Sequence, residues 1–542
     1  MNTLYYGDNL DILRRYIKDE SVDLIYLDPP FNSNATYNVL FGEKDGTKAE
    51  AQIQAFDDTW HWDTAASEAF QEVVESGGNV SRAMQSFRVV LGDNDMLAYL
   101  AMMAPRLVEL HRVLKPTGSI YLHCDPTASH YLKVLLDSVF GAVNFRNEII
   151  WKRNFTKKGS QYKMTRFANN ADILLFYVKS DKAYFKTPKV KRSDFEVEQK
   201  YNLIDEKGRK FKSEPLELPQ MMARPNLIFE FMGYTPKWGW MMSREKLEEL
   251  KKQEKIYFTA NGKPRRKNFL VDYEGSEIDN IWIDIHPLGQ NPSEALGYPT
   301  QKPEDLLVRV INASSNEGDL VLDPFCGCGT AIAVAQKLNR NWIGIDITHL
   351  AINLMKTRLQ TAFGDQAKFT VIGEPVSLDD AKALAESDKY QFQWWALGLV
   401  GARPADQKKG SDKGIDGRIY FHESDKGETK QVIISVKGGG TTVSQLRDLR
   451  GVIDRENAEI GVLITLEEPT QPMRSEVASA GYYISPIWGK FPRLQILTIQ
   501  ELLEGKQILM PPISQVSTTF KKAPKSSPKQ GDQAPLFPGN SN

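Results

Sequence analysis

Four consecutive residues at the end of an apolar run could bind and orient a planar base. Residues 22–27 (VDLIYL) are followed by Asp28, Pro29, Pro30 and Phe31. Because the prolines remove backbone donors and restrict the chain, the Asp28 carboxylate and the Pro29 carbonyl could accept hydrogen bonds from an exocyclic NH2 group. Phe31 offers a ring for stacking. The alternative is a strand that ends at a proline pair with a capping aspartate.

A second motif has the pattern of a ligand-binding turn. In residues 320–330, LVLDPFCGCGT, an apolar run leads through a glycine-containing turn into a helical pattern. Gly327 and Gly329 permit tight turning and close approach of a ligand. Asp346 ends the next apolar run about 20 residues later, where an acid can bind a ribose diol. The spacing favours an adenosine-containing ligand, and the alternative is a turn needed only for packing.

The elements around both motifs predict a parallel α/β fold. Short apolar runs and amphipathic patterns alternate over residues 1–150 and again over residues 303–375. Such alternation is typical of βαβ units, with helices on both faces of a parallel, Rossmann-like sheet. We expect a long loop-rich excursion over residues 32–95, and weak periodicity from 151 to about 290.

Composition excludes several classes of protein. The chain has 542 residues, 41% of them apolar and 25% charged, which indicates a globular protein of several domains and excludes wholly disordered classes. No apolar run is long enough to span a bilayer, so no membrane partner is expected. Cys124, Cys326 and Cys328 cannot form a disulfide framework, which favours a cytoplasmic location.

Positive charge is concentrated in the middle of the chain. Residues 151–270 contain 28 Lys and Arg against 14 Asp and Glu, a net +14 within a chain whose total is −1. Lys263, Arg265, Arg266 and Lys267 stand in an expected loop. This pattern is typical of a segment that faces nucleic acid, and the alternative is a solvated, lysine-rich insertion.

Together the motifs resemble those of the DNA amino-methyltransferases. Asp28-Pro29-Pro30-Phe31 resembles the catalytic tetrapeptide of that family, and DPFCGCGT, residues 323–330, resembles its cofactor loop. Supporting segments at residues 6–9 (YGDN), 114–125 (LKPTGSIYLHCD) and 298–303 (YPTQKP) are also similar. The catalytic motif precedes the cofactor motif, an order that resembles the beta class.

The resemblance implies methyl transfer from S-adenosylmethionine to N6 of adenine or N4 of cytosine in double-stranded DNA. The base would be extruded from the duplex, with Asp28 and the Pro29 carbonyl accepting the amine hydrogens and Phe31 stacking on the ring. Asp28 at the first motif position favours adenine. The implied cofactor-binding residues are Asp8, Thr300, Lys302, Asp323, Phe325, Gly327, Gly329, Thr330 and Asp346.

A different pair of residues could do chemistry near the C-terminus. Asp416 stands at the entry to an expected strand and Lys437 at the end of its partner, where they could hold Mg2+ and orient a water. The segment resembles the Mrr-type branch of the PD-(D/E)xK nucleases. Ser435 stands where that family has an acid, so an inactive relative that only binds DNA is one alternative, and a coincidental match is another.

These interpretations divide the chain into five segments. We expect a catalytic half over 1–150, a target-recognition region over 151–290, a cofactor-binding half over 291–380, a nuclease-like domain over 388–506 and a disordered tail over 511–542. The expected partner is double-stranded DNA, with a homodimer or restriction–modification subunits as further candidates. The nuclease-like domain either cuts DNA or acts as a sensing module.

Overall fold

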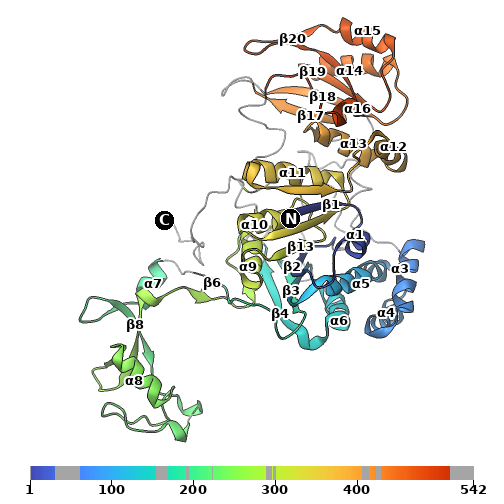
Figure 1. The fold of residues 1–542 in the computed structure, drawn as a ribbon. Coiled ribbons are helices and arrows are strands. Elements are labelled where there is room, and N and C mark those ends of the chain that lie inside the picture. The colour runs from blue at the N-terminus through green and yellow to red at the C-terminus, as the bar shows by residue number, and fades with distance from the viewer. Residues whose placement is uncertain are drawn as a thin grey trace, which may run out of the picture. The chain divides into compact units, whose positions relative to one another are not determined.

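The computed structural model shown in Figure 1 describes most of the chain. The described residues are 2–30, 62–153, 169–190, 194–222, 224–288, 294, 296, 301–405, 414–422 and 429–512. Two compact units are present, Met1–Lys186 with Asn280–Pro528, and Thr187–Asp279. Within the described residues, no helix combines the length and the apolar character needed to cross a membrane.

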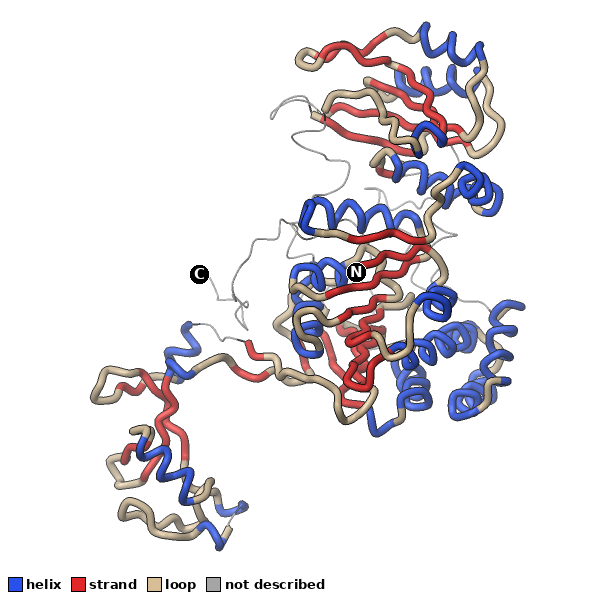
Figure 2. The backbone as a smooth tube through the Cα atoms, viewed as in Figure 1, coloured by secondary structure: helices blue, strands red, loops and turns tan. Residues whose placement is uncertain are grey.

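The larger unit contains a nine-stranded sheet (Figure 2) in the order β12-β4-β5-β3-β2-β13-β14-β1-β15. Its strands are β1 (Asn2–Tyr6), β2 (Val22–Leu27), β3 (Leu114–Cys124), β4 (Phe145–Lys152), β5 (Ala171–Val178), β12 (Ile281–Trp282), β13 (Leu320–Asp323), β14 (Asn341–Asp346) and β15 (Phe369–Ile372). All run parallel except β5, which is antiparallel to β3 and β4. The predicted Rossmann-like α/β fold is confirmed, and the motif strands β2 and β13 are neighbours.

The sheet extends beyond the boundary expected at residue 150. Strand β5 pairs with β3 and β4, and β12 pairs with β4. The sequence of β5, ADILLFYV, is an apolar run that is buried over most of its length. It therefore belongs to the sheet interior and not to a surface recognition region.

Helices cover both faces of this sheet. They are α1 (Asn9–Tyr16), α3 (Thr64–Glu75), α4 (Gly78–Leu91), α5 (Asp95–Val113), α6 (Ser129–Phe140), α9 (Glu304–Ser314), α10 (Thr330–Lys337) and α11 (His349–Phe363). In Figure 1, α9 and α10 lie on one side of the sheet, and α1, α5 and α6 on the other.

The expected loop-rich excursion over residues 32–95 is wrong where the structure describes it, because residues 64–91 form α3 and α4. Phe70 and Val73, and likewise Met84 and Phe87, are buried pairs at helical spacing. They join the core beneath α5. The described part of the excursion is therefore a helical layer.

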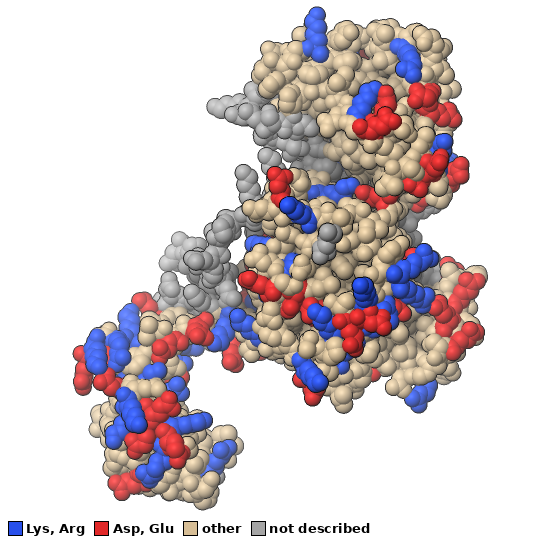
Figure 3. Space-filling view, viewed as in Figure 1, with Lys and Arg blue, Asp and Glu red and all other residues tan. Residues whose placement is uncertain are grey.

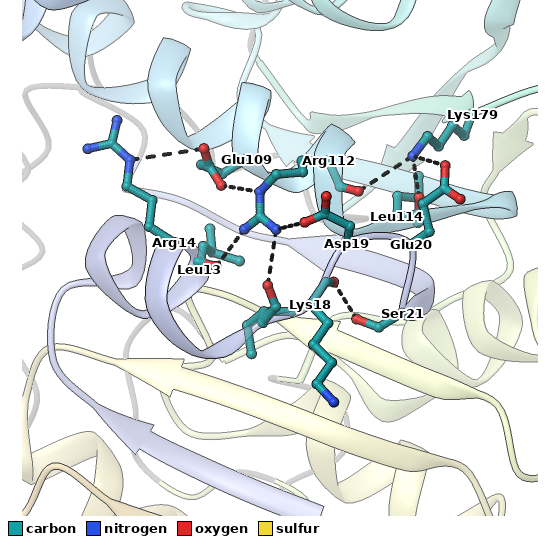
Figure 4. Close-up of polar contacts among 11 residues, drawn as sticks. Leu13, Arg14, Lys18, Asp19, Glu20, Ser21, Glu109, Arg112, Leu114 and Lys179 are labelled. Carbon is teal, nitrogen blue, oxygen red and sulfur yellow. Dashed lines mark hydrogen bonds and ion pairs between the residues drawn. The ribbon is translucent and has the colours of Figure 1, made fainter.

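A cluster of polar contacts secures the start of β2 (Figure 4). Arg112, near the end of α5, donates to the carbonyl of Leu13 at 2.7 Å and to that of Ile17 at 3.1 Å. Lys179 donates to the carbonyl of Leu114 at 2.6 Å. The Arg112 bonds satisfy carbonyls at the end of α1 and attach the turn before β2 to α5, while the Lys179 bond satisfies the C-cap carbonyl of α5. The strand that leads to the first motif therefore has a defined position.

The C-terminal part contains a five-stranded sheet in the order β16-β17-β18-β19-β22. Its elements are β16 (Arg403–Pro404), β17 (Gly417–Phe421), β18 (Lys430–Lys437), β19 (Ile460–Thr465), β20 (Tyr482–Ser485), β21 (Gly489–Pro492), β22 (Leu494–Thr498), α12 (Leu378–Ser387), α13 (Lys389–Leu399), α14 (Val443–Arg455), α15 (Gln471–Ser479) and α16 (Ile499–Leu503). Strands β17 and β18 are antiparallel, and β18, β19 and β22 are parallel. The expected tail lies almost entirely outside the described residues.

The unit Thr187–Asp279 is attached through a two-stranded antiparallel ribbon of β6 (Lys189–Val190) and β11 (Ser276–Glu277). It contains α7 (Asp194–Lys200), α8 (Arg244–Lys252), β7 (Leu203–Ile204), β8 (Lys210–Pro215), β9 (Ile256–Phe258) and β10 (Pro264–Phe269). Its small core includes Leu216, Phe231, Trp240 and Leu247. The basic run at Lys263–Lys267, expected in a loop, instead enters strand β10, which pairs with both β8 and β9.

Candidate active site at the carboxyl edge of the sheet

Three aspartates follow or end neighbouring strands at one edge of the sheet. Asp28 follows β2, Asp323 ends β13 and Asp346 ends β14. Burial raises the pKa of Asp323 well above its usual value, and nearby Asp28 and Asp346 raise it further. Burial also raises the pKa of Asp346. The raised pKa values favour the neutral acids, and a cationic ligand at this edge would shift both groups back toward their ionised forms.

Asp28 has one oxygen paired and one available. Lys302 Nζ donates to Asp28 Oδ2, and both side chains are largely buried. Asp28 Oδ1 is buried and has no hydrogen-bond partner among the described residues. A buried acceptor without a partner is costly, so Oδ1 is a natural acceptor for a ligand N–H. Pro29 is buried and Pro30 exposed, while Phe31 lies outside the described residues.

Asp346 organises the glycine loop. Its Oδ2 accepts from the Gly327 N–H at 2.9 Å, and its Oδ1 accepts from the backbone N–H and the hydroxyl of Thr348, each at 2.9 Å. These bonds, with a further backbone hydrogen bond from Ile347, fix the position of the carboxylate beside the glycine loop. The sequence predicted the ribose contact but not the bonds to Gly327 and Thr348.

Two glycines are needed for the conformation of this loop. Gly327 has a φ of 48° and Gly329 a φ of 71°, both in the left-handed region. A Cβ at Gly329 would also lie 2.5 Å from Met355 Cγ. Phe325 packs partly against the core, and its N–H donates to Asp323 Oδ1 at 3.1 Å. The predicted loop residues are thus brought together beside the acidic edge.

A buried arginine that the sequence analysis missed supports the same loop. Arg358, on α11, donates to the carbonyl of Cys328 at 3.1 Å and to the hydroxyl of Thr330 at 3.2 Å. It also donates to Glu304 at 3.1 Å. Thr330, predicted to bind cofactor, is therefore tied to α11 and α9. A charged residue on the apolar face of a predicted helix is the signal that could have indicated this contact.

Asp8 and its neighbours hold α1 against the cofactor motif. Asp8 caps α1 by accepting from the Leu10 N–H at 2.8 Å, and it also accepts from Arg106 at 2.6 Å. Asn9 Nδ2 donates to the carbonyl of Pro324 at 2.8 Å. In the described part of the chain, Asn9, the residue after Asp8, donates this hydrogen bond to the cofactor motif. Thr300 lies outside the described residues.

A buried polar chain lies behind Asp28. The imidazole of His123 connects the Tyr26 hydroxyl, at 2.8 Å, to the carboxylate of Asp172, at 3.3 Å. Burial alone would raise the pKa of Asp172, but the bond to His123 and the nearby Arg153 and Lys302 outweigh it and lower this pKa. These residues were not predicted as site residues.

The two loop cysteines are not candidates for nucleophiles. Cys326 and Cys328 are both buried. Burial raises the pKa of each thiol, and for Cys326 the nearby Asp346 raises it further. The thiols are therefore protonated at neutral pH, and the thiolate is the reactive form.

The predicted residues of the nuclease-like site lie together, and both oxygens of the Asp416 carboxylate already accept hydrogen bonds from protein. Asp416 Oδ2 accepts from the Ser435 hydroxyl at 3.0 Å and from the Val436 N–H at 2.6 Å. Its Oδ1 accepts from Gln393 at 3.0 Å, and Lys437 Nζ lies 3.8 Å from Oδ2. No cluster of three His, Cys, Asp or Glu side chains suitable for a metal occurs among the described residues. The donor set does not fit the expected Mg2+.

The basic middle of the chain carries many internal ion pairs. Figure 3 shows both signs of charge intermixed on the visible face of the unit Thr187–Asp279. Its pairs include Lys189–Glu274, Lys207–Glu254, Lys212–Glu214 and Lys263–Glu217. The positive excess is therefore interleaved with acids and does not form one uniform patch on that face.

Residues 22–357 match the model of the N6_N4_Mtase family, described as DNA methylase. The chain belongs to this DNA methylase family. It is 30% identical over 361 residues to the type II methyltransferase M.EcaI of Enterobacter cloacae, covering 66% of this chain and 69% of that one. It is 23% identical to the StyLTI Mod subunit of a type III restriction-modification enzyme from Salmonella typhimurium, covering 62% of this chain and half of that subunit.

Solved DNA methylases show weaker similarity. A DNA modification methylase of Thermus thermophilus covers 69% of this chain and all of its own, with 15% identity and a TM-score of 0.33. The PvuII cytosine-N4-specific methyltransferase covers 66% of this chain and 86% of its own, with 14% identity and a TM-score of 0.33. Because these TM-scores are low, the fold assignment rests on the strands and helices described above.

The C-terminal part of this DNA methylase has its own match. Residues 389–504 match the model of the NACHT-associated inactive restriction endonuclease 1. This match supports the expected nuclease-like fold but does not confirm the Mrr-type branch. A model of inactive endonucleases agrees with the filled carboxylate of Asp416.

Proposed function

We propose that this DNA methylase transfers a methyl group from S-adenosylmethionine to N6 of adenine in double-stranded DNA. The observation that carries the proposal is the pairing at Asp28, where Lys302 holds one oxygen and leaves the other, buried oxygen as an acceptor. The acidic edge formed with Asp323 and Asp346 suits the positive charge of a sulfonium cofactor.

The residues fit the cofactor in a specific way. Asp346 ends the strand that follows the glycine loop, the position at which an acid can bind a ribose diol, and Gly327 and Gly329 give the loop the conformation for a ligand to approach its backbone. The cofactor supplies the methyl group when bound. Lys302, which the resemblance places among the cofactor residues, also contacts the Asp28 carboxylate.

The chain contributes positioning and electrostatics. Asp28 Oδ1 accepts one hydrogen of the base amine and the Pro29 carbonyl accepts the other, which directs the nitrogen lone pair toward the methyl group. Methyl transfer would place positive charge on the base nitrogen, and the Asp28 carboxylate would stabilise that charge. The methylated amine would then lose one proton to solvent water. No covalent enzyme intermediate is required.

The choice of adenine rests on Asp at the first position of the tetrapeptide. The second candidate is N4 methylation of cytosine, with the C-terminal domain as an inactive DNA-binding or sensing module. Mass spectrometry of DNA methylated by the purified protein tests the choice. N6-methyladenine is expected, and N4-methylcytosine would refute the base assignment without touching the methyl-transfer assignment.

The nuclease-like domain is proposed to act without cutting DNA. Support comes from Asp416, whose oxygens already accept from Ser435, Val436 and Gln393. Unmethylated plasmid incubated with the protein and Mg2+, with and without S-adenosylmethionine, should stay intact. Nicking that is lost in Asp416→Ala would reverse this assignment.

Four further expectations stay predictions. They are the target-recognition role of residues 151–290, a homodimer, restriction–modification partners and a cytoplasmic location.

A further inference from the structure

Helix α13 contacts both the nuclease-like centre and the cofactor side of the methylase sheet. Two glutamines, two residues apart on this helix, have different partners. Gln393 donates to Asp416 in the nuclease-like centre at 3.0 Å. Gln391, which is buried, accepts at 3.0 Å from the backbone N–H of His349 on α11.

The hydrogen bond from the His349 N–H to Gln391 satisfies a backbone donor that has no partner within helix α11. The first N–H groups of an α-helix have no partner within the helix, and His349 is the first residue of α11. Its preceding residue, Thr348, caps the helix and donates two hydrogen bonds to Asp346. Gln391 therefore completes the cap of the helix whose N-cap residue holds the expected ribose-binding carboxylate.

The packing around this bond is close. The His349 ring is fully buried and stacks on Tyr6 with a centroid separation of 3.6 Å, and Tyr6 pairs in register with Asp346. Asn353, one turn along α11, donates to the Trp394 carbonyl of α13 at 3.0 Å. A displacement of α13 would thus leave buried backbone groups without partners at both positions.

We propose that Gln391 is a positioning residue for the cofactor, through which the nuclease-like domain holds the start of α11 and with it Asp346. This rests on the proposed function, since it assigns the ribose contact to Asp346. The nuclease-like domain is then a structural part of the cofactor site, whether or not it binds DNA.

The matched pair of glutamines provides the test in the full-length protein. Gln391→Ala should raise the dissociation constant for S-adenosylmethionine by about 3- to 10-fold, the range expected for one lost hydrogen bond. Gln393→Ala removes a half-buried, hydrogen-bonded amide from the same helix and should leave that constant unchanged. Gln391→Glu keeps the acceptor oxygen and should restore most of the affinity. Isothermal titration calorimetry measures all three.

Methylation kinetics and thermal melting separate positioning from general damage. Gln391→Ala should raise KM for S-adenosylmethionine and leave kcat within about twofold, because Asp28 is untouched. Equal dissociation constants in the two alanine variants, or losses that merely follow their melting temperatures, would overturn the inference. A wild-type protein that binds no S-adenosylmethionine would instead refute the proposed function.

Discussion

Asp28 and Asp416 each lie beside a lysine at a strand end, but the remaining partners of their oxygens differ. Lys302 contacts Asp28 Oδ2, while Asp28 Oδ1 has no partner among the described residues. Asp416 accepts from a hydroxyl, a backbone N–H and a side-chain amide, with Lys437 at 3.8 Å. The same pair of residue types therefore leaves one carboxylate with an oxygen that can accept from a ligand, while both oxygens of the other already accept from protein.

The comparison teaches that proximity of an acid and a lysine does not define a reactive site. A carboxylate can bind a ligand or a metal only through lone pairs that the protein has not used. Ser435 is decisive at the second site, because its hydroxyl donates to Asp416 where an acid would share a metal. If the proposed assignment holds, this one residue type separates a centre that could bind Mg2+ from one that cannot.

Replacing each aspartate by alanine is the most direct test of the difference between Asp28 and Asp416. Asp28→Ala should reduce kcat for methylation by roughly 10²- to 10³-fold, the usual loss for one preorganised electrostatic group. Its dissociation constant for S-adenosylmethionine should change little, as calorimetry can verify. Asp416→Ala is the matched control and should methylate DNA at the wild-type rate. Near-normal methylation by Asp28→Ala would remove Asp28 from the catalytic assignment.

Substitutions of Lys302 and Lys437 should differ in the same way as those of the two aspartates, with a loss of methylation only at Lys302. Lys302→Met should lower kcat by roughly 10- to 100-fold, because the Asp28 carboxylate loses the charge-assisted bond that orients it. Lys437→Met should leave methylation unchanged. Steady-state kinetics with varied S-adenosylmethionine decides where Lys302 acts. A rise in KM at constant kcat would place Lys302 on the cofactor instead.

The smallest expected effect concerns Ser435, beside Asp416. Ser435→Asp should replace a donor to Asp416 with a second acid, so that the two carboxylates repel each other unless a cation lies between them. We expect Mg2+ to raise the melting temperature of this variant by a few degrees, on the order of 1 kcal/mol. The wild-type protein should show no such rise. An equal response in both proteins would mean that Ser435 does not control metal binding.

Short-range features of the site could be predicted from the sequence. The strands leading to Asp28, Asp323 and Asp346 are apolar runs that end at polar or glycine residues, and such runs identify buried strands. The proximity of Asp416 and Lys437 could be expected as well, because an antiparallel pair brings both strand ends together.

Contacts between distant segments could not be predicted. Lys302 and Asp28 are 274 residues apart, and Arg358 reaches Glu304 across two helices. No local pattern specifies such pairs, since they depend on how the elements pack. The basic sequence around residues 171–178 obscures a short apolar run, so the sequence alone places this strand in the recognition region.

The ribbon of β6 and β11 gives the unit Thr187–Asp279 both of its ends in one place. Val190 pairs with Ser276 and Lys189 with Glu277, so the chain enters and leaves side by side. A segment attached in this way can be exchanged for another with the same two-stranded base without rerouting the host strands. In evolution, such a cassette can diversify while the catalytic sheet edge is inherited unchanged, and in engineering the ribbon marks where to cut and graft.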